Sequence, residues 1–411
     1  SEKLASFLEK LDPRVEVALE CNHVRAGDTV VVSPGIKPGA PIFDEAEKKG
    51  CEVIGEIALF QRLKGDVPVL AITGTDGKST TTTWLGAMCE AANKPTWVGG
   101  NLGTPLCESV DELTEEHVVV AEVSCFQLST AAEFHPQAAI VTNLAPDHLD
   151  YYQGSYEAYT AAKARVLANL EVGEAAILNA DDPLLSTWAA PAGATTLWFS
   201  RLRALSDNEQ GVFVDGDLLR ARIGDLDTPL IPVSELSLPG AHNVENAMAA
   251  AAAALSFGLD TEAVCHAMRT FGGLVHRIEW VRELNGVTWY NDSKATNPHA
   301  AEAALKAFEG PVVLICGGSE KGSDFGEWAD LVVAHCSHVI CFGESSPRMV
   351  AALDDRISLK HVSDLSEAVA EAKHAASADG VVVLSPACAS FDQFESYEHR
   401  GDVFKEMILA L

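Results

Sequence analysis

One stretch constrains the fold of this chain more than any other: residues 71–80 read Ala-Ile-Thr-Gly-Thr-Asp-Gly-Lys-Ser-Thr. They follow the apolar, β-branched run at 67–72 and precede residues 81–92, which favour a helix. A strand, a Gly-rich turn and a helix in this order are typical of a phosphate-binding loop. Gly74 and Gly77 permit positive φ angles and close approach of a phosphate, and the helix N-terminus adds unpaired N–H groups and a partial positive charge.

The residues after these glycines have the chemistry that a nucleotide needs. Lys78 can reach the outer phosphates, and Ser79 can hold Mg²⁺. The strict pattern G-x-x-x-x-G-K-[ST] is not met, because Ile72 occupies its first position. An ordinary Gly-rich loop at the start of a helix is the alternative interpretation, but Lys-Ser after Gly at such a turn favours a nucleotide. The predicted nucleotide contacts in this loop are Gly74, Thr75, Asp76, Gly77, Lys78, Ser79 and Thr80.

Composition restricts the class of protein. With 411 residues, 47% of them hydrophobic, the chain can hold two or three domains with substantial cores. No run reaches the roughly 18 apolar residues of a membrane span and no signal peptide is visible, so we predict no membrane insertion and a cytoplasmic location. Ten scattered cysteines without a C-x-x-C pair fit reduced thiols. The net charge of −30 argues against nucleic-acid binding, and an anionic ligand must be attracted by local groups.

The apolar runs predict an α/β fold in three parts. Residues 1–60 read as an incomplete α/β domain, with helices expected at 2–11 and 42–49 and strands at 28–32 and 52–54. Residues 61–272 hold the phosphate loop and a parallel-type sheet, with near-continuous apolar strands at 117–123, 138–143 and 175–179, a β-hairpin region at 211–231 and helices at 155–168 and 243–257. Residues 273–411 restart the alternation as a doubly wound, Rossmann-like domain, with strands at 287–290, 312–316, 338–342 and 380–384.

Polar clusters follow the strands of the last domain, at the edge where parallel sheets bind ligands. They lie at 291–294, 317–321 and 385–390. His276 and Arg277 open this domain. An arginine at a domain junction can bridge to the phosphates of a nucleotide held next door, although a surface salt bridge is the plainer interpretation.

Three further residues suggest metal or acid–base chemistry near the phosphate loop. Glu122 ends a buried strand, where a carboxylate needs a partner or a metal, and it suits Mg²⁺; a paired structural glutamate is the alternative. His148 follows the next strand, between Asp147 and Asp150, and histidine is a common metal ligand and acid–base group. Lys163 lies on an Ala-rich helix, a pattern that by itself favours a solvated lysine.

Together these motifs resemble the Mur ligases of bacterial cell-wall synthesis over residues 33–411. The resemblance rests on SPGI at 33–36, GTDGKST at 74–80, GGNLG at 99–103, EVSCFQ at 122–127, DHLD at 147–150, AK at 162–163, GAHNVEN at 240–246 and HR at 276–277. Two further motifs are similar to the D-glutamate-adding branch in particular: NDSKATN at 291–297 and SPACASFDQF at 385–394. The D-N-P-R motif of the diaminopimelate- or lysine-adding branch is absent.

The resemblance implies a three-domain architecture: a UDP-binding α/β domain, shortened here, a central P-loop ATPase and a C-terminal Rossmann-like domain. It implies an ATP-dependent amide ligase of peptidoglycan synthesis that joins D-glutamate to UDP-N-acetylmuramoyl-L-alanine. The substrate carboxylate takes the γ-phosphoryl group, the D-glutamate amine attacks the acyl phosphate, and phosphate leaves. The implied cofactors are ATP and two Mg²⁺ ions, and we expect a monomer.

The same resemblance assigns roles to single residues. Lys78, Glu122, His148 and Lys163 form the implied catalytic set. Ser79 and Glu122 would hold the first Mg²⁺, and His148 and a carbamylated Lys163 the second, because CO₂ converts the amine into an oxygen ligand. The implied ATP contacts outside the loop are Asn243, Asn246, Arg277 and Asp292. The implied D-glutamate contacts are Lys294, Thr296, Lys321, Ser390, Phe391 and Tyr397. The implied contacts of the muramoyl substrate are Ser33, Gly35, Asn101, Gln127 and His148.

Several features depart from the family pattern. Asp76 stands where the family has Asn, Tyr151 where it often has Arg, and Tyr397 where Phe is common. The strand, Gly-rich loop and next strand that the family uses for uracil and diphosphate are missing. Either the sequence is truncated at this end, or residues 33–36 and Asn101 rebuild the nucleotide-sugar site. The alternative functions are another Mur ligase or a folylpolyglutamate synthetase, a nucleotide-binding regulatory relative without the complete UDP site, and a small-molecule kinase.

Overall fold

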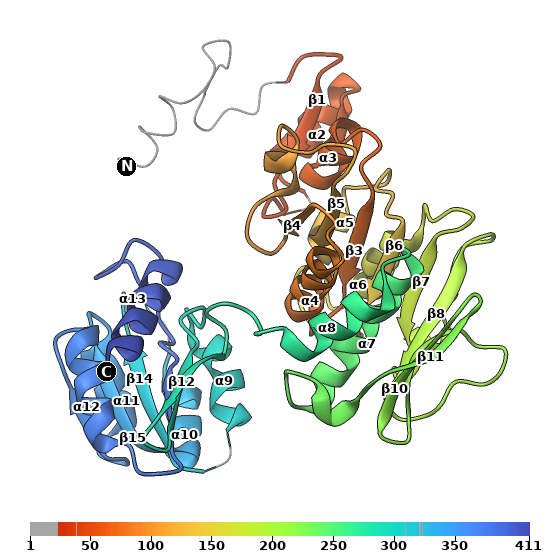
Figure 1. Cartoon of the computed structure of the whole chain (residues 1–411). Coiled ribbons are helices and arrows are strands. Elements are labelled where there is room, and N and C mark those ends of the chain that lie inside the picture. Colours follow the sequence, from red (N-terminus) through yellow and green to blue (C-terminus); the bar gives the residue numbers. More distant parts are fainter. Residues whose placement is uncertain (1–23, 38, 309, 320–321, 323) are drawn as a thin grey trace. The chain divides into compact units, whose positions relative to one another are not determined.

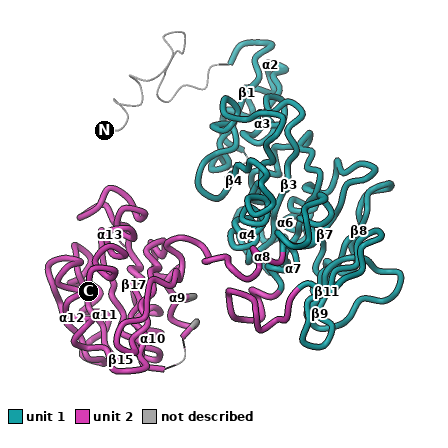
Figure 2. Tube along the Cα trace, viewed as in Figure 1, with its two compact units in different colours: residues 1–230, 245–264 teal, residues 231–244, 265–411 magenta. Residues whose placement is uncertain are grey.

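The computed structural model describes residues 24–37, 39–308, 310–319, 322 and 324–411. The helix expected at 2–11 lies outside them. The chain divides into two compact units (Figure 2). The first comprises the described residues up to Leu230 together with Glu245–Val264, and the second comprises Ile231–Val244 and Cys265–Leu411. The predicted boundary at 60/61 falls inside a helix of the first unit, and the boundary at 272/273 lies shortly after the second unit resumes.

A nine-stranded sheet forms the centre of the first unit (Figure 1). Its order is β11-β10-β9-β8-β7-β6-β3-β5-β4. The strands are β3 (Val69–Thr73), β4 (Thr96–Gly100), β5 (Val118–Glu122), β6 (Ala138–Val141), β7 (Ala175–Asn179), β8 (Thr195–Ser200), β9 (Gly211–Asp215), β10 (Leu218–Ile223) and β11 (Leu226–Pro232). Neighbouring strands from β4 to β9 are parallel, whereas β9 and β10 are antiparallel. The predicted parallel sheet and the predicted hairpin region are both confirmed.

Helices cover both faces of this sheet. They are α3 (Glu56–Leu63), α4 (Lys78–Ala91), α5 (Cys125–Leu128), α6 (Tyr156–Ala164) and most of α7 (Ala241–Ser256). Helix α8 (Thr261–Thr270) begins in this unit and ends in the second. Every residue of β3 and β5 is buried, as expected for parallel strands with a layer on each side. One face packs on α3 residues such as Ile57 and Phe60, and α4 packs on β3, β4 and β5. The alanine run of α7 is buried on all sides, so this helix is part of the core.

A smaller element precedes the main sheet. Strands β1 (Thr29–Val32) and β2 (Glu52–Gly55) pair in parallel and are joined by α2 (Pro41–Lys49). Gly50 ends α2 in the left-handed conformation that its sequence position predicts. Ser33 and Gly35 lie in the turn after β1, which the Ile36 amide closes on the Ser33 carbonyl. Strands and helix were expected in this region, and all three are confirmed.

The second unit is a six-stranded sheet with order β12-β13-β17-β14-β15-β16. Its strands are β12 (Glu279–Leu284), β13 (Val287–Asn291), β14 (Val312–Gly317), β15 (Cys336–Phe342), β16 (Leu359–His361) and β17 (Val381–Leu384). All pairs are parallel except the edge pair β12–β13. Its helices are α9 (Pro298–Ala307), α10 (Gly326–His335), α11 (Ser346–Leu353), α12 (Leu365–Ala375) and α13 (Tyr397–Ala410).

Alternate residues of these strands enter two separate cores. Leu314 packs with α9, α10 and α11 on one face, and Ile315 packs with α12 and α13 on the other. This is the predicted doubly wound arrangement, and it leaves the carboxyl ends of β13, β14 and β17 side by side. Among the described residues of the whole chain, no helix has both the length and the apolar content that crossing a membrane requires.

Candidate active site

The phosphate loop has the predicted setting, between β3 and α4. Gly74 has a φ of 145°, and a Cβ there would lie 1.9 Å from Thr142 Oγ1. Gly77 caps α4 with a φ of 78°, and a Cβ there would lie 2.2 Å from Asn246 Oδ1. Both positions therefore require glycine for backbone angle and for space. Asn246, a predicted ATP contact on α7, is buried against the loop and accepts a hydrogen bond from Thr81 Oγ1 at 3.2 Å.

Two residues that follow β6, the strand next to β3, form hydrogen bonds with the phosphate loop. The Asp76 amide donates to Asn143 Oδ1 at 2.9 Å, and its carbonyl accepts from Thr142 Oγ1 at 2.6 Å. The Asp76 side chain itself is exposed, so solvent screens the negative charge that this departure from the family adds. Lys78 Nζ donates to the Thr75 carbonyl at 2.6 Å, which keeps the ammonium at the mouth of the loop.

Tyr159 of α6 is a loop partner that the sequence did not reveal. Its hydroxyl lies 2.8 Å from Thr75 Oγ1, and the ring is fully buried. It precedes Lys163 by one helical turn, so the two side chains lie on the same face of α6. Thr75 Oγ1 also bonds the backbone of Ala145. Tyr159 therefore ties α6 to the phosphate loop.

Removing this hydroxyl should loosen the loop without disturbing the fold. We expect Tyr159→Phe to lower kcat/KM for ATP by about fivefold, since a neutral hydrogen bond contributes about 1 kcal/mol. Steady-state phosphate release at varied ATP measures the effect. Tyr156→Phe is the matched control, because Tyr156 stacks on the Tyr159 ring from the same helix. Equal effects of the two substitutions would show that the Thr75 contact has no role.

Glu122 fits a hard cation. It is buried at the end of β5, Asn101 Nδ2 donates to its Oε1 at 2.7 Å, and its Oε2 has no hydrogen-bond partner among the described residues. An orphaned buried carboxylate oxygen is costly unless a cation completes it. The described residues contain no group of three or more His, Cys, Asp or Glu side chains arranged for a metal. Mg²⁺ needs only one or two carboxylates besides phosphates and water, so Glu122 suits Mg²⁺.

Asn101 and Gln127, both predicted to face the muramoyl substrate, have structural contacts here. Asn101 orients Glu122, as described above. Gln127 Oε1 accepts hydrogen bonds from the Ser124 amide and hydroxyl, forming a capping box at the start of α5. Neither contact tests a role in binding substrate, so both assignments stay predictions.

His148 lies in a strained loop against aromatic rings. Its φ is 50°, its side chain is half-exposed, and Nε2 lies 3.3 Å from Asp147 Oδ2. Its ring centroid lies 5.0 Å from that of Phe126, which in turn packs edge-on against Tyr151 at 4.5 Å. Tyr151, which stands where the family often has Arg, thus supports His148 through Phe126.

Lys163 is buried, so the solvated lysine that its Ala-rich helix suggested is wrong. Its Nζ donates to the Gly74 carbonyl and lies 4.8 Å from the centre of the Tyr159 ring. Burial first, and then the charge of Lys78, lower the pKa of Lys163 to about 8. About a tenth of this amine is therefore neutral near pH 7, far more than for an ordinary lysine, and the neutral amine is the form that reacts with CO₂.

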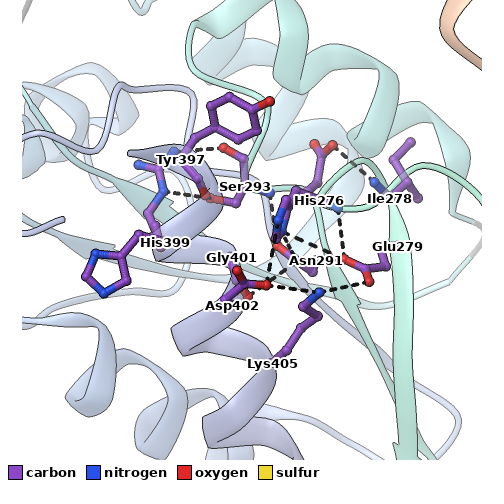
Figure 3. A network of polar contacts seen from close by, with 12 residues as sticks. His276, Ile278, Glu279, Asn291, Ser293, Tyr397, His399, Gly401, Asp402 and Lys405 are labelled. Carbon is purple, nitrogen blue, oxygen red and sulfur yellow. Dashed lines mark hydrogen bonds and ion pairs between the residues drawn. The ribbon is translucent and has the colours of Figure 1, made fainter. Parts of the chain in front are cut away.

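The second unit contains a polar network around His276 and Asn291 (Figure 3). Nδ1 of the buried His276 ring lies 2.9 Å from Asn291 Nδ2. The backbone carbonyl of His276 accepts a hydrogen bond from the Lys294 amide. His276 and Ile278 both have positive φ, a strained geometry that these bonds hold. The exposed Arg277 lies between them.

Asp292 is bonded to this turn from the end of β13. It accepts from the Ile278 amide at 3.2 Å and from Ser385 Oγ at 2.7 Å. Burial raises the pKa of Asp292 to about 7. Arg277 and Asp292 thus lie at one turn, and their contacts with ATP stay predictions. Asn243, a further predicted ATP contact, donates to the Pro239 carbonyl at the start of α7.

Except for Lys321, the predicted amino-acid contacts lie on the loops after β13 and β17 and at the start of α13. Ser293 Oγ, between Asp292 and Lys294, donates to the Tyr397 carbonyl at 2.8 Å and so links the first loop to α13. Burial raises the pKa of Tyr397 to about 12. Ser390 is buried and its Oγ has no partner among the described residues, whereas Phe391 is largely exposed. Lys294 and Thr296 are half-buried, and Lys321 lies outside the described residues.

Comparisons with known proteins identify the family. Residues 72–254 match the Mur ligase middle domain, and residues 276–388 match the Mur ligase glutamate ligase domain. A UDP-N-acetylmuramoylalanine–D-glutamate ligase of Acidobacterium capsulatum is 44% identical over 94% of this chain and 83% of its own length. One of Pelotomaculum thermopropionicum is 42% identical over 93% and 84%. The UDP-N-acetylmuramate–alanine ligase of Thermotoga maritima shares the fold, with a TM-score of 0.59 at 21% identity over 93% of this chain and 85% of its own. The chain belongs to the Mur ligase family.

Proposed function

We propose that this chain joins D-glutamate to UDP-N-acetylmuramoyl-L-alanine in an ATP-dependent reaction of peptidoglycan synthesis. The observation that carries the proposal is the similarity, over 93–94% of the chain, to relatives named for that activity. The buried Glu122 and Lys163 beside the phosphate loop support it, because a regulatory relative without catalysis would not need them.

The residues would divide the chemistry as follows. ATP supplies a phosphoryl group that turns the substrate carboxylate into an acyl phosphate, which the amine of D-glutamate converts to an amide with release of phosphate. Lys78 and the amides at the start of α4 would bind phosphoryl oxygens. The hydrogen bonds of Thr142 and Asn143 to Asp76 hold the loop, so that these donors are positioned before the nucleotide binds. Glu122 and Ser79 would hold Mg²⁺, which offsets phosphate charge.

We further propose that Lys163 is carbamylated in the active enzyme and holds a second Mg²⁺ with His148. An ammonium could offset charge but could not ligate a metal, whereas a carbamate offers oxygens. The burial and lowered pKa of Lys163 support this proposal, since they favour the neutral amine. The remaining assignments rest on the family resemblance: Arg277, Asp292, Asn243 and Asn246 for ATP, and Ser33, Gly35, Asn101 and Gln127 for the muramoyl substrate. A monomeric state and a cytoplasmic location are part of the same proposal.

The deciding experiment measures phosphate release with ATP, Mg²⁺ and UDP-N-acetylmuramoyl-L-alanine. D-glutamate should support release and amide formation, whereas L-glutamate, glycine and L-lysine should not. Activity with another amino acid would indicate a different Mur ligase, and a stable phosphorylated product would indicate a kinase. Nucleotide binding without turnover under all these conditions would favour a regulatory protein.

Lys321 provides a test of amino-acid selection. Its ammonium could bind a carboxylate of D-glutamate by a charge-assisted hydrogen bond. We expect Lys321→Ala to raise the KM for D-glutamate by about tenfold with little change in the KM for ATP, measured by phosphate release. The exposed Lys360 on β16 offers a control, Lys360→Ala, that removes the same charge from the same unit. Equal effects on both KM values would assign Lys321 to the nucleotide or to the fold.

A further inference from the structure

Arg400, in the first turn of α13, is a fully buried arginine that none of the assignments above uses. Its Nε donates to Ser293 Oγ at 2.9 Å, and its Nη2 donates to the Ser293 carbonyl at 2.8 Å. Its Nη1 donates to the carbonyls of Cys388 and Ala389 at 3.1 and 3.2 Å. One side chain thus contacts two chain segments that are far apart in sequence.

These acceptors lie at the edge of the sheet where ligands bind. Ser293 follows β13 and the 388–389 carbonyls follow β17, its neighbour in the sheet. A longer contact, 3.5 Å to the Gly317 carbonyl, reaches the last residue of β14, the next strand. The fork of a guanidinium suits this task, because its donors have fixed directions and can hold several carbonyls at once.

The charge of Arg400 is the second observation. All the hydrogen bonds described for its guanidinium end on carbonyl or hydroxyl oxygens, and none ends on a carboxylate. Burial lowers the pKa of Arg400 to about 10, so the group is still a cation near pH 7. A buried cation is costly, and the nearby carboxylates of Asp392 and Asp292, which raise the pKa of Arg400, offset part of that cost.

A third observation points to a ligand in the same place. Ser390 follows the two carbonyls that Arg400 holds, and its Oγ is buried without a partner among the described residues. A buried hydroxyl without a partner in the protein is expected to bind a ligand or water. The loop that Arg400 holds therefore contains a hydroxyl, that of Ser390, that could form a hydrogen bond with a ligand oxygen.

We propose that Arg400 is a positioning residue of the amino-acid site, holding the loops after β13 and β17 in register. This inference rests on the proposed function and deepens it. Arg400 itself acts through the loops that carry Lys294 and Ser390.

The test compares Arg400→Lys with wild-type enzyme in phosphate release at varied D-glutamate and varied ATP. Lysine keeps the charge but loses the fork, so we expect the KM for D-glutamate to rise on the order of tenfold while the KM for ATP changes less than about twofold. Ser293→Ala removes one acceptor and keeps the arginine. It should raise the same KM by about threefold, and it keeps the test decisive if Arg400→Lys does not fold.

Arg282→Met is the matched control. Arg282 Nη1 donates to the Ile408 and Leu409 carbonyls at the other end of α13, so its loss removes a comparable arginine–carbonyl contact far from the strand ends. A merely structural role for Arg400 predicts that Arg282→Met and the Arg400 and Ser293 variants lower thermal stability alike and leave the KM for D-glutamate unchanged, and that result would overturn the proposal. Wild-type enzyme that does not respond to D-glutamate would instead contradict the proposed function.

Discussion

Replacing Lys78 by alanine is expected to lower ATP turnover by at least about 10²-fold, the loss usual for a preorganised group that meets charge developing in the transition state. The ammonium lies at the mouth of the loop, 2.6 Å from the Thr75 carbonyl, on a helix start that glycine backbone angles and Thr142 hold in place. Phosphate release under saturating substrates measures the loss, and circular dichroism checks the fold.

Lys94→Ala is the control for this prediction. Lys94 follows α4 in the same unit and is exposed, so its loss removes the same charge from the surface. Its turnover should match wild type. If Lys78→Ala turned over ATP at a near-normal rate, Lys78 would have no part in the mechanism and the phosphate loop would need another ligand.

The second large effect is expected for Lys163→Arg, which should lower turnover on the order of 10²-fold. Arginine keeps a positive charge but does not deprotonate near neutral pH and does not form the carbamate. The larger guanidinium would also crowd this buried position, because the lysine amine lies between the Gly74 carbonyl and the Tyr159 ring. Thermal melting therefore accompanies the kinetic measurement, so that a folding defect is recognised.

Dissolved CO₂ separates the carbamate from a simple lysine role. Wild-type turnover should fall in CO₂-free buffer and return when bicarbonate is added, whereas Lys163→Arg should respond to neither change. A crystal structure with Mg²⁺ and nucleotide should show a carbamate on Nζ within about 3 Å of a metal ion or His148. A plain lysine in that structure, together with CO₂-independent turnover, would contradict the modification.

Local sequence patterns predicted the main strands of this protein, the phosphate loop and the helix that follows it. The β-branched run before Gly74 and the Gly-Lys-Ser turn after it are local features, and β3, the loop and α4 follow from them. Continuous apolar runs predicted strands with two covered faces, and β5, β7 and β14 are buried at every position. The cluster at 291–294 starts at the last residue of β13 and the cluster at 385–390 directly after β17. They lie at one edge because parallel strands bring their carboxyl ends together.

The environment of single side chains was beyond the reach of those patterns. The sequence pattern of its own helix suggested that Lys163 is solvated. The packing of α6 on the phosphate loop, which a local pattern does not contain, buries the amine. Tyr159 and Arg400 bond to segments distant in sequence, so no local spacing contains their partners. Sequence by itself thus determined which elements form and where the predicted phosphate loop lies. Tertiary structure alone decided which charges are buried, because burial and pKa depend on all the elements that surround a group.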